Sequence, residues 1–169
     1  MLLSNYLLSG GVKPYLEYGW VTAPNAGAQS LTNNTISALT IDTEVADTGN
    51  NGSISGNQIT LNAGTYYFEA NVRLQSTNGD WITSIFSLYN VTDSSYVTRT
   101  EEHFGLNLAI ASILKGQFTI SSSKLFELRI LPSTPSGTPI VKSGSYYAGF
   151  SNSTAGADQR TTIKLWKLA

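Results

Sequence analysis

The chain is predicted to be an all-β protein, a sandwich or barrel of short antiparallel strands. Several segments alternate apolar and polar residues with a period of two, which is the pattern of half-buried strands. Clusters of turn-forming residues separate these segments, and no segment keeps a helical period convincingly. Charged residues make up only 12% of the 169 residues and aromatic residues 11%, a composition that favours strands over helices with charged surfaces.

The elements follow one another with no change in composition that would divide the domain. The clearest strand covers residues 65–74, where Tyr66 and Phe68 lie on the face opposite Tyr67 and Glu69. Gly64 before it is predicted to allow a tight turn, because glycine has no Cβ. In chain order the predicted strands cover residues 15–22, 36–45, 58–61, 65–74, 81–91, 96–100, 106–114, 117–120, 124–131, 140–150 and 160–168. The predicted turns and loops cover residues 23–34, 47–52, 62–64, 76–80, 92–95 and 132–139.

Residues 1–14 are predicted to form an N-terminal arm, and residues 15–169 a single domain. The arm carries five large apolar residues among its first eight: Leu2, Leu3, Tyr6, Leu7 and Leu8. Ser9-Gly10-Gly11 then indicates a turn, and Pro14 interrupts any regular element. Leaving five such side chains in water is costly, so we interpret the arm as a docking peptide; a disordered terminus is the alternative.

Composition argues against several classes of function. The net charge is −1 and the ten basic residues are spread thinly, so neither nucleic acid nor a membrane surface is an expected partner. The chain contains no cysteine, which removes disulfides and thiolate metal sites. No apolar stretch approaches the ~20 residues of a membrane span, and the apolar start is too short for a secretion signal. Folding in the cytoplasm where the chain is made is therefore expected.

The sequence offers little catalytic chemistry. Its single histidine, His103, follows two glutamates, and no nucleophile-elbow motif accompanies it. The Asp47–Gly52 segment is rich in Asp, Asn and Gly but lacks the spacing of a calcium loop, so we interpret it as a turn. We expect no enzyme activity, no metal and no cofactor.

One run of residues resembles a known family. Residues 53–70, SISGNQITLNAGTYYFEA, resemble the central hairpin of C1q/TNF-like jelly-roll domains, in the form found in bacteriophage virion proteins. Residues 87–93 (SLYNVTD) and 161–168 (TTIKLWKL) fit the same family, so the resemblance extends over roughly residues 30–169. It implies an antiparallel jelly-roll β-sandwich.

The resemblance also implies a compact homotrimer, with apolar residues lining the threefold axis. The strand 124–131 fits this, because Leu125 and Leu131 lie on the face opposite its other apolar residues. The residues assigned to the core or the trimer contact are Tyr66, Phe68, Phe126, Leu128, Ile130 and Trp166.

Two functions are compatible with these features. The first is a trimeric structural protein of a phage virion, either a capsid decoration (cement) protein or a head fibre. Its arm would dock on the major capsid protein or another virion protein. The second is a tail-fibre tip or carbohydrate-binding module that recognises a host-surface glycan through the loops 75–80, 132–139 and 151–159. The aromatic residues that could stack on such a sugar are Trp20, Trp81, Tyr146 and Tyr147, and contact with the core or with the trimer partner is the alternative for each.

Overall fold

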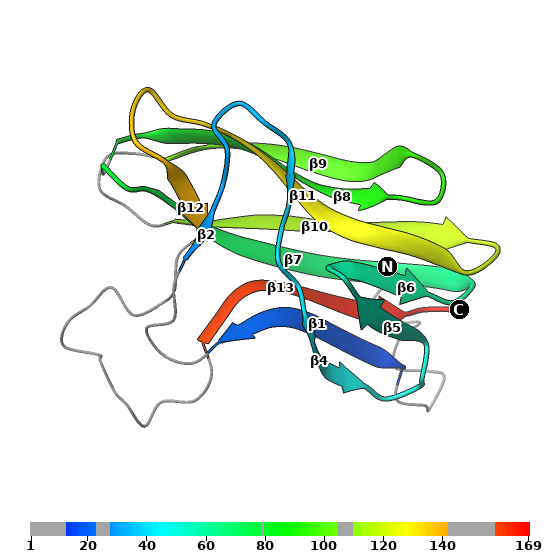
Figure 1. Ribbon diagram of the computed structural model, residues 1–169. Helices are drawn as coiled ribbons and strands as arrows, with labels where there is room; N and C mark the ends of the chain where they lie inside the picture. Colours follow the sequence, from blue (N-terminus) through cyan, green and yellow to red (C-terminus); the bar gives the residue numbers. More distant parts are fainter. Residues whose placement is uncertain (1–12, 23–27, 79, 105–109, 142–157) are drawn as a thin grey trace, which may run out of the picture.

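The structure is a computed structural model, and it describes residues 13–22, 28–78, 80–104, 110–141 and 158–169. Two antiparallel sheets pack face to face as a sandwich, and the described ranges contain strands and loops only (Figure 1). No helix in those ranges could therefore span a membrane. The two-sheet architecture confirms the predicted all-β class.

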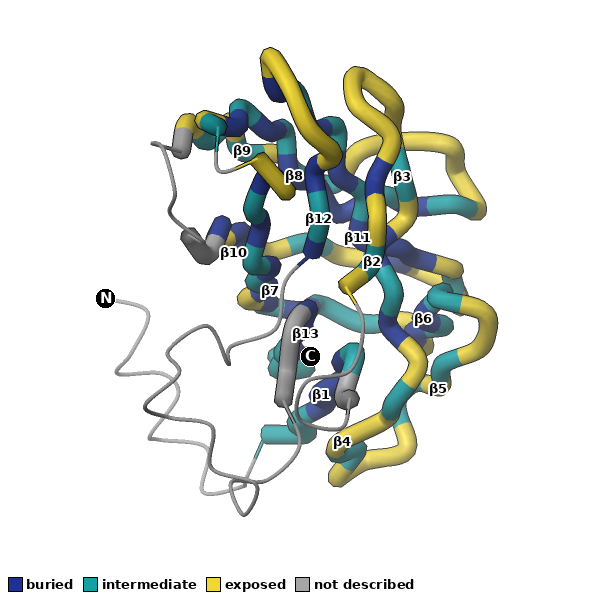
Figure 2. The backbone as a smooth tube through the Cα atoms, turned by 60° about the vertical axis from the view of Figure 1, so that its left-hand side comes forward, coloured by how far each residue is buried: buried dark blue, intermediate teal, exposed yellow. Residues whose placement is uncertain are grey.

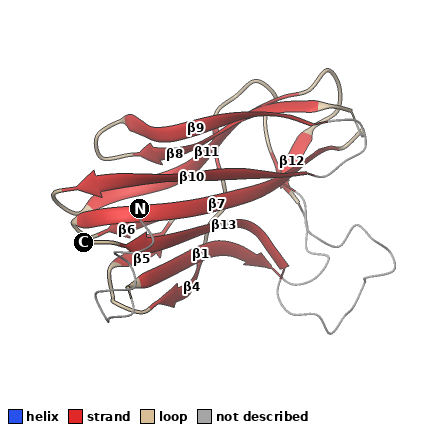
Figure 3. Ribbon diagram, turned by 180° about the vertical axis from the view of Figure 1, so that it is seen from behind, coloured by secondary structure: helices blue, strands red, loops and turns tan. Residues whose placement is uncertain are grey.

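The two sheets, A and B, are built from strands far apart in sequence. Sheet A has the order β2-β12-β7-β13-β1-β4. β12 and β13 pair with different parts of one edge of β7, and β10 pairs with its other edge. Its strands are β1 (Tyr15–Thr22), β2 (Gln29–Ser30), β4 (Thr43–Asp47), β7 (Gly64–Ser76), β10 (Ile110–Ile120), β12 (Pro139–Val141) and β13 (Asp158–Lys167). Sheet B has the order β5-β6-β11-β8-β9, with β3 also paired to β11. Its strands are β3 (Ser37–Ala38), β5 (Gly52–Ser55), β6 (Gln58–Leu61), β8 (Ile82–Asn90), β9 (Ser95–Phe104) and β11 (Lys124–Ser133); Figure 3 shows the sandwich from behind.

The core lies between the sheets and is made by the inward face of each strand. From β7, Tyr66 and Phe68 are fully buried, as the alternation in the sequence predicts. From β11, Phe126, Leu128 and Ile130 meet them at 1% exposure or less. In Figure 2 the buried positions follow the strands, whereas the exposed stretches are mainly loops.

Within residues 53–70 the sequence predicts a hairpin that turns at residues 62–64, and this position is wrong. The hairpin is formed by β5 and β6, through a two-residue turn at Gly56 and Asn57. Both turn residues have positive φ angles, 57° and 66°, the type I′ geometry that matches the twist of paired strands. Because β6 belongs to sheet B and β7 to sheet A, residues 62–63 carry the chain between sheets.

Gly64 is required by a close approach of two backbones. A Cβ at this position would lie 2.7 Å from the carbonyl oxygen of Ala169. The N–H of Thr65 donates to that same oxygen at 2.8 Å, and the N–H of Leu168 donates to the carbonyl of Thr65 at 2.7 Å. The C-terminal residues thus continue the pairing of β13 with β7, and the tight turn predicted here is replaced by this contact.

Four other predicted strands also differ from the structure or extend beyond its described part. The segment 36–45 is divided into β3 in sheet B and β4 in sheet A, and both Leu39 and Ile41 between them are fully buried. The alternating pattern of residues 36–45 therefore comes from a buried connection between the two sheets and not from one continuous strand. The segments 106–114 and 117–120 meet in a single strand, β10, which passes through Gly116 without a break. Of the predicted strand 140–150, only residues 140–141 are described, and they belong to β12.

The predicted turn at residues 47–52 is organised by one carboxylate. Asp47 Oδ1 accepts hydrogen bonds from the N–H groups of Gly49 (3.0 Å) and Asn51 (3.1 Å). Asp47 Oδ2 accepts a third from the N–H of Gly52 at 3.0 Å. These bonds satisfy backbone donors that the turn leaves without strand partners, and they fix the connection from β4 to β5.

We therefore expect Asp47→Ala to lower the free energy of unfolding by about 2 kcal/mol, because three donors lose a charged acceptor. Chemical denaturation followed by tryptophan fluorescence measures this. Asp42→Ala is the matched control, since Asp42 is exposed and, among the described residues, its carboxylate accepts a hydrogen bond from the neighbouring Thr43 hydroxyl alone, at 2.8 Å. Equal losses in the two variants would show that the Asp47 bonds contribute nothing specific.

Candidate binding surfaces

The residues predicted for the core or the trimer contact lie in two different places. Tyr66, Phe68, Phe126, Leu128 and Ile130 lie between the sheets and are buried in the core. Trp166 lies on the outer face of sheet A and is half-buried. The predicted arm residues Leu2, Leu3, Tyr6, Leu7 and Leu8 lie outside the described residues.

Three aromatic rings cross the outer face of sheet A in one row. Trp166 of β13 lies between Tyr15 of β1 and Tyr67 of β7, because the strand register places each opposite the next. The ring centroids are 5.5 Å apart for Tyr15 and Trp166 and 5.7 Å apart for Tyr67 and Trp166. We call these three residues the aromatic row. They form an amphipathic strip of the kind that is enriched at protein interfaces.

Carboxylates hold the two tyrosines of the aromatic row in position. The Tyr15 hydroxyl donates to Glu17, and the Tyr67 hydroxyl donates to Glu69 Oε1 at 2.8 Å. For Tyr15, burial together with this bond raises the pKa of the phenol above its ordinary value. For Tyr67, the hydrogen bond to Glu69 is the main cause of a raised pKa. A tyrosine is neutral at physiological pH even without these shifts, so the row presents apolar rings with neutral hydroxyls.

The same face carries an isolated apolar side chain on its edge strand. Ile113 of β10 is 61% exposed, and it lies opposite Asn71 of β7. Lys115 follows on the same face, opposite Glu69. Because β10 is paired on one side only within the described strands, Ile113 is accessible at the rim of this face. Ile113 thus adds exposed apolar area to the face that carries the aromatic row.

A second candidate surface lies at the end of the sandwich where β7 leads into β8. Trp81, directly before β8, is 46% exposed. The β7–β8 loop beside it is bonded to the β11–β12 loop: Thr77 N–H donates to the Thr138 carbonyl at 3.0 Å, and Thr138 N–H donates to Thr77 Oγ1 at 2.9 Å. We call Asn78, Asp80, Trp81, Ser136 and Thr138 the Trp81 loop surface.

Polar side chains brace this loop surface. The Ser136 hydroxyl donates to the Asp80 carboxylate, and Asn78 Nδ2 donates to Ser136 Oγ at 3.4 Å. The structure thus brings together two of the three loops predicted for sugar recognition, 75–80 and 132–139. The third loop, 151–159, lies outside the described residues for all but its last two positions. The result is an exposed indole beside amide, hydroxyl and carboxylate groups.

The other aromatic candidates fall elsewhere. Trp20 is half-buried and packs against the core. Tyr146 and Tyr147 lie outside the described residues.

His103 lies on the outer face of sheet B. Its Nδ1 is 3.0 Å from Thr83 Oγ1, and its Nε2 is 3.6 Å from Glu101 Oε1. The order hydroxyl, imidazole, carboxylate resembles a catalytic triad, but the side chains of His103 and Glu101 are 73% and 61% exposed. Water competes for each of these contacts, and 3.6 Å is too long for a hydrogen bond, so nothing here activates the hydroxyl.

Within the described residues, no cluster of three histidine or acidic side chains could hold a metal ion. The carboxylate of the Asp47 turn already accepts three backbone hydrogen bonds. This turn therefore has a structural role in positioning β5.

The sequence did not predict the aromatic row. Tyr15, Tyr67 and Trp166 are separated by 50 or more residues, and only the strand register places them together. The available signal was the alternation in 65–74, which put Tyr67 on the outward face.

Comparison with known proteins identifies the fold. No protein-family model and no curated protein matches the chain. A crystal structure of murine APRIL at pH 5.0 superimposes with a TM-score of 0.56 at 12% identity, covering 93% of this chain and 100% of that chain. The globular domain of zebrafish complement 1qA protein superimposes with a TM-score of 0.52 at 10% identity, covering 94% and 98%. At these identities the likeness shows the fold alone, and that fold is the predicted C1q/TNF-like jelly roll.

Proposed function

We propose that the protein is a non-enzymatic structural protein of a bacteriophage virion that works as a homotrimer. In this role it decorates or cements the capsid, or forms a head fibre, after synthesis in the host cytoplasm. Its N-terminal arm, residues 1–14, would dock on the major capsid protein or another virion protein. The observation that carries the proposal is the outer face of sheet A, with its aromatic row and exposed Ile113.

The features of this face favour self-association. Three adjacent rings and an isoleucine offer apolar area, while Glu69, Lys115 and Lys164 on the same face provide charges of both signs. Such a mixture suits an interface with another copy, because each charge can find an opposite partner. The jelly-roll fold supports the trimer through the resemblance of residues 53–70 to C1q/TNF-like domains.

The virion assignment rests on the sequence. Residues 53–70 are similar to the form of this fold in phage virion proteins, and the five large apolar residues of the arm favour docking on a protein surface. The non-enzymatic part is supported by the solvent-exposed position of His103.

We expect sedimentation velocity at micromolar concentration to detect a trimer, and Ile113→Asp to convert it to monomer. A carboxylate at this position would have to be desolvated in the interface, whereas in the monomer it lies in water. Ile36→Asp is the matched control, because Ile36 is 51% exposed next to β3 of sheet B. A stable wild-type monomer, or a trimer unaffected by Ile113→Asp, would contradict the proposed interface.

Removal of residues 1–12 tests the arm. The truncated protein is expected to remain a folded trimer, since it keeps β1 and Lys13, whose ammonium donates to the Leu168 carbonyl at 3.0 Å. It should no longer bind capsids in a co-sedimentation assay with purified shells. Full decoration by the truncated trimer would disprove the docking role.

The second candidate function is recognition of a host-surface glycan by a tail-fibre tip or carbohydrate-binding module. The observation in its favour is the Trp81 loop surface, where an exposed indole lies beside fixed polar groups. Aromatic side chains with this exposure can stack on the apolar face of a sugar.

A glycan array tests this candidate. Sub-millimolar binding by the wild type, lost in Trp81→Ala, is the expected result if the loop surface recognises the sugar. Tyr96→Ala is the control, because Tyr96 is a 44% exposed aromatic residue on β9, away from these loops. Retention of binding in Trp81→Ala would exclude this location.

A further inference from the structure

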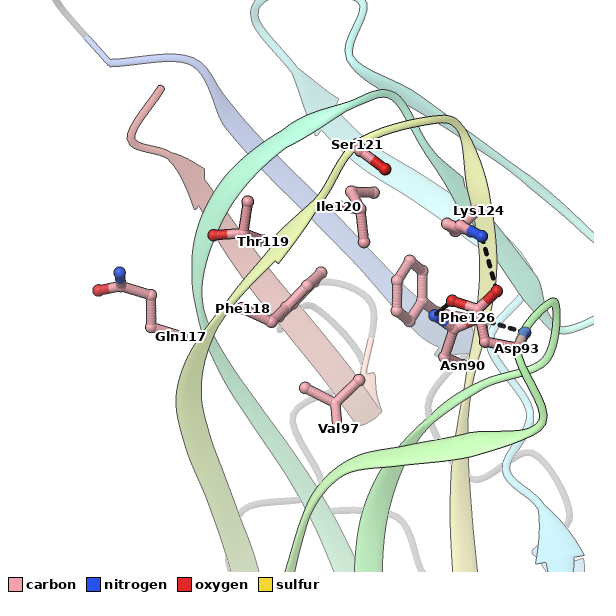
Figure 4. A pocket seen from close by; sticks show the side chains of 10 residues that line it. All are labelled: Asn90, Asp93, Val97, Gln117, Phe118, Thr119, Ile120, Ser121, Lys124 and Phe126. Atoms are coloured by element: carbon pink, nitrogen blue, oxygen red, sulfur yellow. Dashed lines mark hydrogen bonds and ion pairs between the residues drawn. The ribbon is translucent and has the colours of Figure 1, made fainter.

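A cleft opens between the β9 and β10 edges of the sandwich, near the β10–β11 turn (Figure 4). Its volume is about 300 Å³, at the lower end of the range for small-molecule sites. Asn90 at the end of β8 lines it, so it lies about 30 Å from Trp81 by the rise of that strand. It is separate from the Trp81 loop surface.

An irregularity in the strand pairing of sheet B borders the cleft. The pairing of β8 with β9 shifts by one residue after Leu88, so that Val97 is an extra residue in β9. Figure 4 shows Val97 and Phe118 pointing into the cleft, whereas Gln117 and Thr119 point the other way. Phe118 therefore faces the space between the sheets but keeps part of its ring accessible.

The base of the cleft is apolar and rigid. The ring of Phe118 lies 5.1 Å from that of Phe126, at an interplanar angle of 44°, and 5.7 Å from that of Tyr66. Phe126 is 1% exposed and Ile120 is 8% exposed, so both are fixed by the core. A ligand part that contacts this base must present an apolar face.

One wall of the cleft carries polar groups with fixed positions. Lys124 Nζ bonds Asp93 Oδ1 at 2.6 Å, and Asn90 Nδ2 donates to Asp93 Oδ2 at 2.9 Å. Asn90 Oδ1 in turn accepts from the N–H of Asp93 at 3.0 Å. The side chain of Lys124 is only 20% exposed and that of Asp93 46%, which leaves both able to bond a ligand. The wall thus offers an ammonium donor next to a carboxylate acceptor.

The charges on this wall select against charged ligands. Lys124 and Asp93 are the charged residues among those that line the cleft, and their charges cancel. Because the ammonium and the carboxylate lie side by side, an ion attracted by one is repelled by the other, whereas a hydroxyl group can accept from the ammonium and donate to the carboxylate. Adjacent hydroxyls on a ring can make both bonds at once.

We propose that this cleft binds a single neutral sugar ring, with the C–H face of the pyranose on Phe118 and adjacent hydroxyls on Lys124 and Asp93. A pyranose combines the apolar face that the base requires with the neutral hydroxyls that the wall requires. This site is inferred from neither the trimer nor the arm, so its failure leaves the proposed function untouched.

The test uses the full-length assembled protein and a panel of methyl pyranosides, including glucoside, galactoside, mannoside and N-acetylglucosaminide. Saturation-transfer NMR and calorimetry are expected to detect binding of at least one of them in the millimolar range. Glucuronate and glucosamine, the charged counterparts, should bind more weakly. If no neutral pyranoside binds up to 50 mM, the proposal is wrong.

Two variants and their controls locate the binding. Asp93→Asn should weaken binding about tenfold, because a charged acceptor is lost. Val97→Phe should abolish it by filling the cleft. Asp42→Asn and Val45→Phe make the same changes at exposed positions in and next to β4, on the other edge of the sandwich, and should leave binding unchanged.

The remaining outcomes each give a clear result. Unchanged binding in Asp93→Asn and Val97→Phe would overturn the proposal. So would binding that is lost in Trp81→Ala but kept in both cleft variants, since the sugar would then be held by the loop surface. Sedimentation of every variant shows whether assembly is preserved, so a change in trimer state is distinguished from a change in binding.

Discussion

The pairing of β7 on both edges is the constraint on which the rest of the structure depends. β10 follows one edge of β7 from Gly64 to Leu74, while β13 and β12 share the other edge. The inward face of β7 supplies Tyr66 and Phe68 to the core, and its outward face supplies Tyr67 to the aromatic row. Core and surface are therefore fixed in relation to each other, because both are set by one strand register.

The sequence predicts which residues of a strand face inward, but it does not predict to which of the two sheets a strand belongs. The alternation in 65–74 correctly gives the inward and outward faces of β7, because a period of two is a property of any half-buried strand. It cannot tell that 36–45 and 58–70 change sheets, because the local pattern contains no information about the pairing partner. Trp81 was one of four aromatic residues predicted as candidates for sugar stacking, and it is 46% exposed, whereas the cleft was not predicted, since its lining residues come from separate strands and turns.

The two outer faces use the few charges of the chain in different ways. On sheet A, the carboxylates of Glu17 and Glu69 accept from tyrosine hydroxyls. On sheet B, Glu127 pairs with Arg129, whose guanidinium lies 3.4 Å from the centre of the Tyr89 ring. This cation–π contact occupies the aromatic face of Tyr89, whereas no described cation covers the aromatic row. With charged residues at only 12% of the chain, the distinction between the faces rests on these few contacts.

The first and last strands lie side by side in sheet A, and this has a mechanical consequence. β1 is hydrogen-bonded to β13 on one side and to β4 on the other. A force applied at Lys13 along the strand direction loads these bonds in shear, so many must break together. Peeling from an edge would break them one after another and needs less force. A force applied to the protein through its N-terminal segment therefore acts on a mechanically strong part of the fold. Resistance to this force is set by the rate at which β1 detaches under load.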